Sequence, residues 1–118
     1  MKKLMKSFYY AFIGIHTGLK SERNMKIHVT IACFVTALGI IVKLKWWEFI
    51  ICLLCFAMVI GAELFNTAIE ITVDLVTKEQ NELAKKAKDI AAGAVLTFAI
   101  FAAIIGFILF IPKIIALF

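Results

Sequence analysis

Charged residues and helix-breaking residues are scarce in this chain. Only 18% of its 118 residues are charged, there is a single proline, and 64% of the residues are hydrophobic. A soluble domain is about 45–50% apolar and carries more frequent turn signals. The composition therefore excludes an ordinary soluble domain and predicts an integral membrane protein.

Several functional motifs are also absent. The sequence has no Walker A loop, no G-x-G-x-x-G fingerprint and no protein-kinase signature, which excludes a soluble-type nucleotide-binding fold. Cys52 and Cys55 form a CxxC pair, but no histidine or cysteine partner lies at the same depth, so we interpret both as small packing residues. The net charge of +5 is explained by the basic residues around the apolar stretches and gives no support for nucleic-acid binding.

Three apolar stretches are candidate transmembrane helices. A helix that crosses the hydrocarbon core needs about 20 residues. We predict spans over residues 27–43, 46–77 and 90–111, and a cytoplasmic loop over 78–89. The second span must project well beyond the core, because its residues rise about 1.5 Å each. The predicted fold is a single-domain, all-α integral membrane protein.

The segment 1–26 is predicted to be an amphipathic helix at the membrane surface, with packing against the bundle as the alternative. Its apolar positions at helical spacing are Leu4, Phe8, Ala11, Phe12 and Ile15. Basic residues concentrate in this segment and in the loop 78–89, so the positive-inside rule places both in the cytoplasm. Trp46 and Trp47 are then interpreted as an interfacial anchor on the outer side.

The second span carries polar residues along one face, namely Glu63, Asn66, Glu70 and Asp74. At about 100° per residue, they fall within an arc of about 80°. Solvation of a helix end that leaves the bilayer explains Asp74 and partly Glu70. It does not explain Glu63, which has apolar residues on both sides. An ionisable residue inside a span is by default a functional hypothesis.

These residue types suit phosphoryl transfer at the cytoplasmic edge of a membrane. Carboxylate and amide oxygens suit Mg²⁺, which takes one or two carboxylates together with phosphate oxygens and water. A deep carboxylate such as Glu63 suits a general base. Lys88 and Asp89 lie at the start of the third span, level with the outer part of the polar face. A lysine there can neutralise phosphate charge.

Three segments, "SERNMKIH", "AELFNTAIEITVDLV" and "LAKKAKDIAAGAVL", resemble the prokaryotic diacylglycerol kinase and undecaprenol kinase family. The resemblance extends from about Ser7 to Ile111. It implies a small three-span lipid kinase of the bacterial inner membrane. It also implies a homotrimer whose active sites are shared between subunits, with ATP as the phosphoryl donor and Mg²⁺ as the cofactor.

The resemblance further implies roles for individual residues. Glu63 matches the general base that takes the proton from the lipid hydroxyl, and Asn66 lies on the same active-site face. Glu22 and Glu70 match the two Mg²⁺-binding carboxylates. The positions assigned to nucleotide contacts are Lys3, Tyr10, Glu22, Glu70, Glu79, Gln80, Asn81, Lys88 and Asp89, and those assigned to the lipid substrate are Asn24, His28 and Glu63.

The segment "ERNMKIH" favours undecaprenol as the lipid substrate. His28 lies where the better-known branch of the family has an acidic residue, and the segment instead resembles the Gram-positive branch. Diacylglycerol is the alternative acceptor. Two other classes of protein compete with a lipid kinase. A small proton-coupled transporter subunit would place its carboxylate near the bilayer midplane, and a holin-like structural oligomer predicts no ion-binding geometry.

Overall fold

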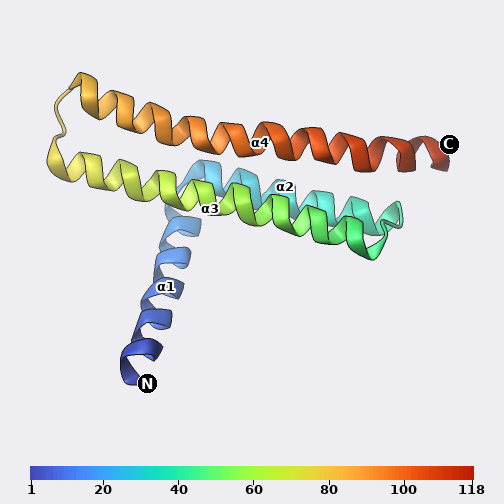
Figure 1. Cartoon of the computed structure of the whole chain (residues 1–118), viewed down its shortest axis with the longest axis horizontal. Helices are drawn as coiled ribbons and strands as arrows, with labels where there is room; N and C mark the ends of the chain where they lie inside the picture. Colours follow the sequence, from blue (N-terminus) through green and yellow to red (C-terminus); the bar gives the residue numbers. More distant parts are fainter.

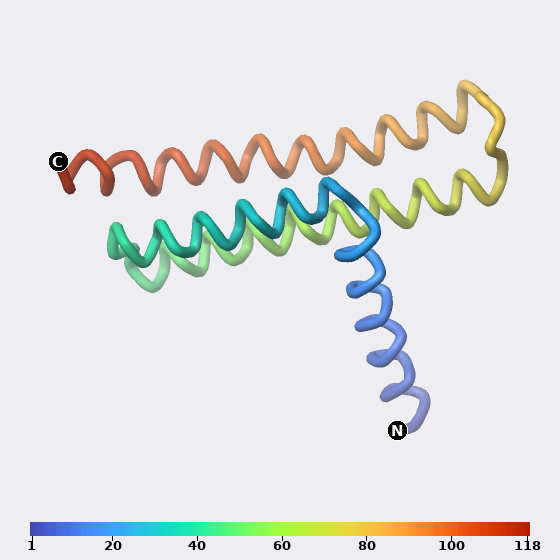
Figure 2. The backbone as a smooth tube through the Cα atoms, turned by 180° about the vertical axis from the view of Figure 1, so that it is seen from behind, coloured from blue at the N-terminus to red at the C-terminus, as the bar shows by residue number.

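The computed structural model describes all residues 1–118, and every regular element is an α-helix (Figure 1). The helices are α1 (Lys2–Ser21), α2 (Arg23–Ile41), α3 (Trp46–Val76) and α4 (Glu82–Leu117). Helices α2, α3 and α4 run alongside one another as an antiparallel bundle, and α1 projects sideways from the start of α2 (Figure 2). The whole molecule measures 55 × 43 × 19 Å.

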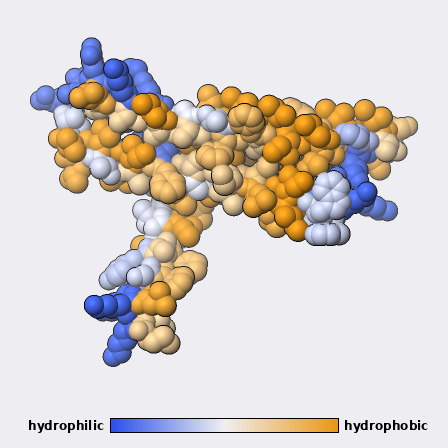
Figure 3. All heavy atoms as spheres, in the orientation of Figure 1, coloured by the Kyte–Doolittle hydropathy of each residue, from blue (hydrophilic) through white to orange (hydrophobic).

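Three of the helices, α2, α3 and α4, are long and apolar enough to cross a membrane. Only 15 of the 118 residues are buried, so most apolar side chains face outward rather than into a core. In Figure 3, hydrophilic residues gather at the α3–α4 turn, at the free end of α1 and near the α2–α3 turn, with apolar surface between them. The chain is therefore a multi-pass membrane protein.

The turn between α2 and α3 is a Schellman motif. The N–H of Lys43 donates to the carbonyl of Ile40 over 3.2 Å, and the N–H of Leu44 donates to that of Gly39 over 2.9 Å. Lys43 takes the left-handed conformation that ends the helix, with a φ of 58°. Glycine is the residue that usually occupies this position, because it has no Cβ to clash with the backbone.

The same end of the bundle has a packed apolar interior. Four buried apolar residues from the end of α2, the α2–α3 turn, α3 and α4 form one cluster: Val42, Leu44, Cys52 and Phe110. Beside it, the buried carboxylate of Glu48 accepts the backbone N–H of Lys45 over 2.8 Å. The ammonium of Lys113 on α4 lies 3.2 Å from the same oxygen. This ion pair ties α4 to the start of α3.

The helix boundaries differ from the predicted ones at the α3–α4 connection. We predicted a loop over 78–89, but α4 already begins at Glu82. The reason is Asn81, whose side-chain oxygen accepts the N–H groups of Leu83 and Ala84 and so caps the helix. At the other end, α4 continues to Leu117, beyond the predicted limit at residue 111.

Helix α1 meets the bundle at one close contact. Gly18 is buried, and a Cβ at that position would overlap with the Cδ2 atom of Leu64 on α3. The missing side chain therefore allows α1 to approach α3 next to Glu63. The chain then turns at Glu22, whose extended backbone (φ −112°, ψ 128°) separates α1 from α2.

Candidate active site

Glu63 is the most enclosed polar residue of the chain. It lies in the middle of α3 with 1% of its surface exposed. Its carboxylate oxygen Oε2 lies 3.7 Å from Nε2 of His28 on α2. The other oxygen, Oε1, is buried and has no hydrogen-bond partner. A buried carboxylate is costly unless it is paired and hydrogen-bonded, so stability of the fold alone does not explain this residue.

Asn66 lies one turn further along the same face and is also buried. Its amide nitrogen donates to Oε1 of the half-buried Glu70 over 3.2 Å, while its amide oxygen has no partner. Buried polar atoms are nearly always hydrogen-bonded in folded proteins. The two unpaired oxygens, on Glu63 and Asn66, are both acceptors and are therefore available to a donor or a cation.

A polar pocket of about 550 Å³ lies where α3 ends and α4 begins. Ten of the eleven residues that line it are polar or charged, and they include five of the predicted nucleotide contacts. These five are Glu79, Gln80, Asn81, Lys88 and Asp89. The structure thus brings the residues of the α3–α4 turn together with the predicted Lys-Asp pair.

Two ion pairs organise the wall of this pocket. Lys88 lies 2.6 Å from Asp74 at the end of α3, and Lys85 lies 2.6 Å from Asp89 one turn along α4. Asp74 was expected only as a solvated residue on the polar face, and Lys85 was considered as a phosphate-binding lysine but was not among the assigned site residues. The i, i+4 spacing of Lys85 and Asp89 was a signal for their pairing. The pairing of Lys88 with Asp74 depends on how α4 packs on α3.

The predicted metal and substrate residues in this part of the chain lie at or near the corner where α1 ends and α2 begins. Glu22 is half-buried there and forms no ion pair, and Asn24 is exposed in the first turn of α2. Between them and His28, the fully buried Met25 anchors the corner. No group of three or more acidic, histidine or cysteine side chains comes together to hold a metal ion.

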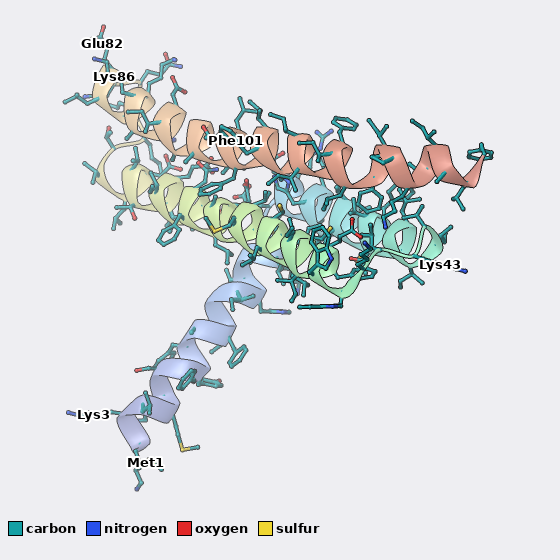
Figure 4. All side chains as sticks on the ribbon, turned by 45° about the vertical axis from the view of Figure 1, so that its right-hand side comes forward. Met1, Lys3, Lys43, Glu82, Lys86 and Phe101 are labelled. Atoms are coloured by element: carbon teal, nitrogen blue, oxygen red, sulfur yellow. The ribbon has the colours of Figure 1, made fainter.

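Lys3 and Tyr10 do not reach the pocket within one chain. Both are exposed on α1. Figure 4 shows Lys3 near the free end of α1, far from Glu82 at the α3–α4 turn. Tyr10 instead contacts the neighbouring Tyr9, with ring centroids 5.6 Å apart.

The structure is that of a membrane protein with an enzyme-like site, in which a buried carboxylate and a polar pocket lie along one side of α3. A family model described as prokaryotic diacylglycerol kinase matches residues 9–110. The chain belongs to the prokaryotic diacylglycerol kinase family. It is a lipid kinase, a phosphotransferase that uses ATP and a lipid alcohol.

Individual relatives agree with this family. The undecaprenol kinase of Bacillus subtilis (strain 168) is 44% identical over 96% of this chain and 92% of that protein. The diacylglycerol kinase of Synechocystis sp. is 39% identical over 97% of this chain and 66% of that protein. The diacylglycerol kinase of Helicobacter pylori (strain J99) is 35% identical over 88% of this chain and 81% of that protein. The kinase hypothesis is therefore favoured over the transporter subunit and the holin-like oligomer.

Proposed function

We propose that the chain transfers the γ-phosphate of ATP to the hydroxyl of a membrane lipid alcohol, with undecaprenol as the preferred acceptor. The observation that carries the proposal is the pair of buried, unpartnered oxygens on α3, Glu63 Oε1 and Asn66 Oδ1. A buried acceptor without a donor is costly until a ligand satisfies it. A lipid hydroxyl can donate to one oxygen, and a hydrated cation can bind beside the other.

In this proposal Glu63 is the general base. The proton of the lipid hydroxyl passes to Glu63 Oε1, and the hydroxyl oxygen forms a bond to the γ-phosphorus as the bond to ADP breaks. The burial of Glu63 within an apolar helix suits a substrate whose chain must stay in lipid while its hydroxyl meets the base.

Mg²⁺ fits the oxygen-rich side chains next to Glu63. Glu70 would hold the ion beside Asn66, whose amide oxygen is unpaired, and Glu22 would supply the second carboxylate. A site without a three-residue protein cage suits Mg²⁺, because this ion takes one or two carboxylates and fills its shell with water and phosphate oxygens. Bound there, the ion would neutralise the charge of the transferred phosphoryl group.

The pocket between α3 and α4 is the proposed nucleotide site. Its volume of about 550 Å³ lies within the range of small-ligand pockets. The pair between Lys88 and Asp74 is partly exposed. Such pairs contribute little to stability, so a phosphate can replace Asp74 as the partner of the lysine. The α3–α4 turn, residues 79–81, would then face the adenosine, with Asp89 beside it.

A homotrimer with shared sites would account for the residues that one chain keeps apart. Lys3 and Tyr10 lie on α1, which points away from the pocket, and α1 of a neighbouring subunit would bring them to it. The exposed apolar residues of α1, among them Leu4, Phe8 and Phe12, fit a helix in the membrane plane. We assign α1 and the α3–α4 turn to the cytoplasmic side of a bacterial inner membrane, because basic residues concentrate in these two segments.

The lipid preference is tested by kinetics on undecaprenol and diacylglycerol, side by side in the same mixed micelles with labelled ATP. We expect activity on both lipids and a higher kcat/KM for undecaprenol. The similarity to the Bacillus subtilis undecaprenol kinase supports that order. A clear preference for diacylglycerol would overturn the assignment of the lipid and leave the phosphoryl transfer in place.

Sharing of sites between subunits is tested by mixing two inactive variants. Glu63→Gln removes the proposed base, and Glu22→Ala removes a proposed metal ligand. In a mixed trimer, some sites combine the intact Glu63 of one chain with the intact Glu22 of another. Partial activity should therefore return. Absence of any rescue in verified mixed trimers would show that each site uses one chain.

A further inference from the structure

We propose that His28 is a positioning residue for Glu63, holding one oxygen of the carboxylate so that the other meets the lipid hydroxyl. The proposal rests on the role of Glu63 proposed above. It replaces the expectation that His28 binds the substrate. The motivating observation is the approach of His28 Nε2 to Glu63 Oε2, 3.7 Å, across the interface between α2 and α3.

His28 is the only basic side chain that approaches the buried carboxylate of Glu63. No lysine or arginine lies within ion-pair distance of it. On α4, Lys85 and Lys88 are engaged by Asp89 and Asp74, and Lys86 forms no ion pair.

The other charged or polar groups on this side of the bundle do not substitute for His28. On α3, the carboxylate of Glu70 accepts the amide of Asn66. The corner residue Glu22, which separates α1 from α2, adds negative charge. A buried carboxylate is costly unless it is paired. His28 is therefore the one basic side chain that is placed to hold the Glu63 carboxylate.

The two carboxylate oxygens then have different tasks. Oε2 faces the imidazole, whose side chain is 19% exposed, and Oε1 has no partner. Anchoring Oε2 restricts rotation of the carboxylate and leaves Oε1 as the acceptor of the substrate proton. A carboxylate that turns freely would align with the hydroxyl less often, and the loss would appear in the rate of the chemical step.

The kinetic test compares His28→Leu and His28→Gln in the full-length protein. We expect His28→Leu to lower kcat by roughly 10–100-fold, the range seen for side chains that orient metal ligands through a similar contact. The KM values for lipid and ATP should stay unchanged. His28→Gln keeps an N–H donor and should recover part of the rate. His16→Leu is the matched control, because His16 is exposed on α1 and forms no ion pair. It should behave like the parent protein.

A second readout does not depend on activity. Infrared spectra of the protein in detergent, without ATP, should show a shifted carboxylate-stretching band in His28→Leu, because the contact with His28 is lost. The band should disappear when Glu63→Gln is added. If His28→Leu does not fold, the partial effect of His28→Gln on kcat and on the same band replaces it.

Three results would overturn the proposal. The first is an unchanged kcat together with an unchanged carboxylate band. The second is a rise in the lipid KM at constant kcat, which would make His28 a substrate contact. The third is a failure of His28→Gln to exceed His28→Leu in rate. Failure of the base assignment itself is recognised separately. In that case Glu63→Gln would retain activity, while His28→Leu in the otherwise unchanged protein would still shift the infrared band.

Discussion

Helix α3 contains two buried carboxylates, and substituting glutamine for each should have opposite consequences. We predict that Glu63→Gln abolishes most phosphoryl transfer and leaves the fold intact. Loss of a general base typically lowers the rate by about 10²–10⁴-fold. That loss corresponds to roughly 2.7–5.4 kcal/mol in the activation barrier.

The small effect on stability follows from the surroundings of Glu63. Its only basic neighbour is His28 at 3.7 Å, and one of its oxygens is unpaired. The contact with His28 is longer than a hydrogen bond, so the carboxylate accepts none, and burying it in that state costs free energy. A neutral glutamine reduces this cost and breaks no hydrogen bond, so the free energy of unfolding should change by no more than about 1 kcal/mol.

Glu48→Gln is the matched control at the other end of α3. Glu48 accepts the N–H of Lys45 over 2.8 Å and pairs with Lys113 at 3.2 Å. The substitution removes the ion pair that ties α4 to α3, so we expect a lower unfolding temperature. The proposed site lies toward the opposite end of the helix, so kcat per folded protein should be unchanged.

The assay measures transfer of label from ATP to lipid in mixed micelles, with thermal unfolding followed by circular dichroism in the same detergent. Two outcomes would refute the reasoning. One is Glu63→Gln activity within about tenfold of the parent, which is less than the removal of a base costs. The other is a loss of kcat in Glu48→Gln that equals its loss in Glu63→Gln.

Substitutions at four further positions test other contacts. Glu22→Ala and Glu70→Ala should each raise the Mg²⁺ concentration needed for half-maximal activity, and an unchanged Mg²⁺ titration would remove that residue from the metal site. Gly18→Ala should cost at most about 1 kcal/mol of unfolding free energy, because the overlapping Cδ2 atom is the end of the flexible Leu64 side chain, and the substitution should become stabilising in a Leu64→Ala background. Lys43→Gly should stabilise the protein by about 0.5–1 kcal/mol in thermal unfolding, because it relieves the left-handed backbone, whereas Lys43→Val should destabilise it.

Some features of the site could be predicted from the sequence because they depend only on neighbours along one helix. The period of 3.6 residues places Glu63, Asn66 and Glu70 on one face wherever that helix packs. The hydrogen bond between Asn66 and Glu70 confirms this face. Three long apolar helices likewise follow from composition alone, and the structure contains them. The start of α4 at Glu82 was missed, although the cap at Asn81 was a readable local signal.

Other features were decided only when the helices packed together. The rotation and axial position of α2 against α3 place His28 opposite Glu63. In the same way, the placement of α4 against α3 puts Lys88 opposite Asp74. Helical periodicity describes one helix and contains no information about its register with another. That register is set by side chains that interlock across the interface, so the partner of the buried carboxylate could be found only in the tertiary structure.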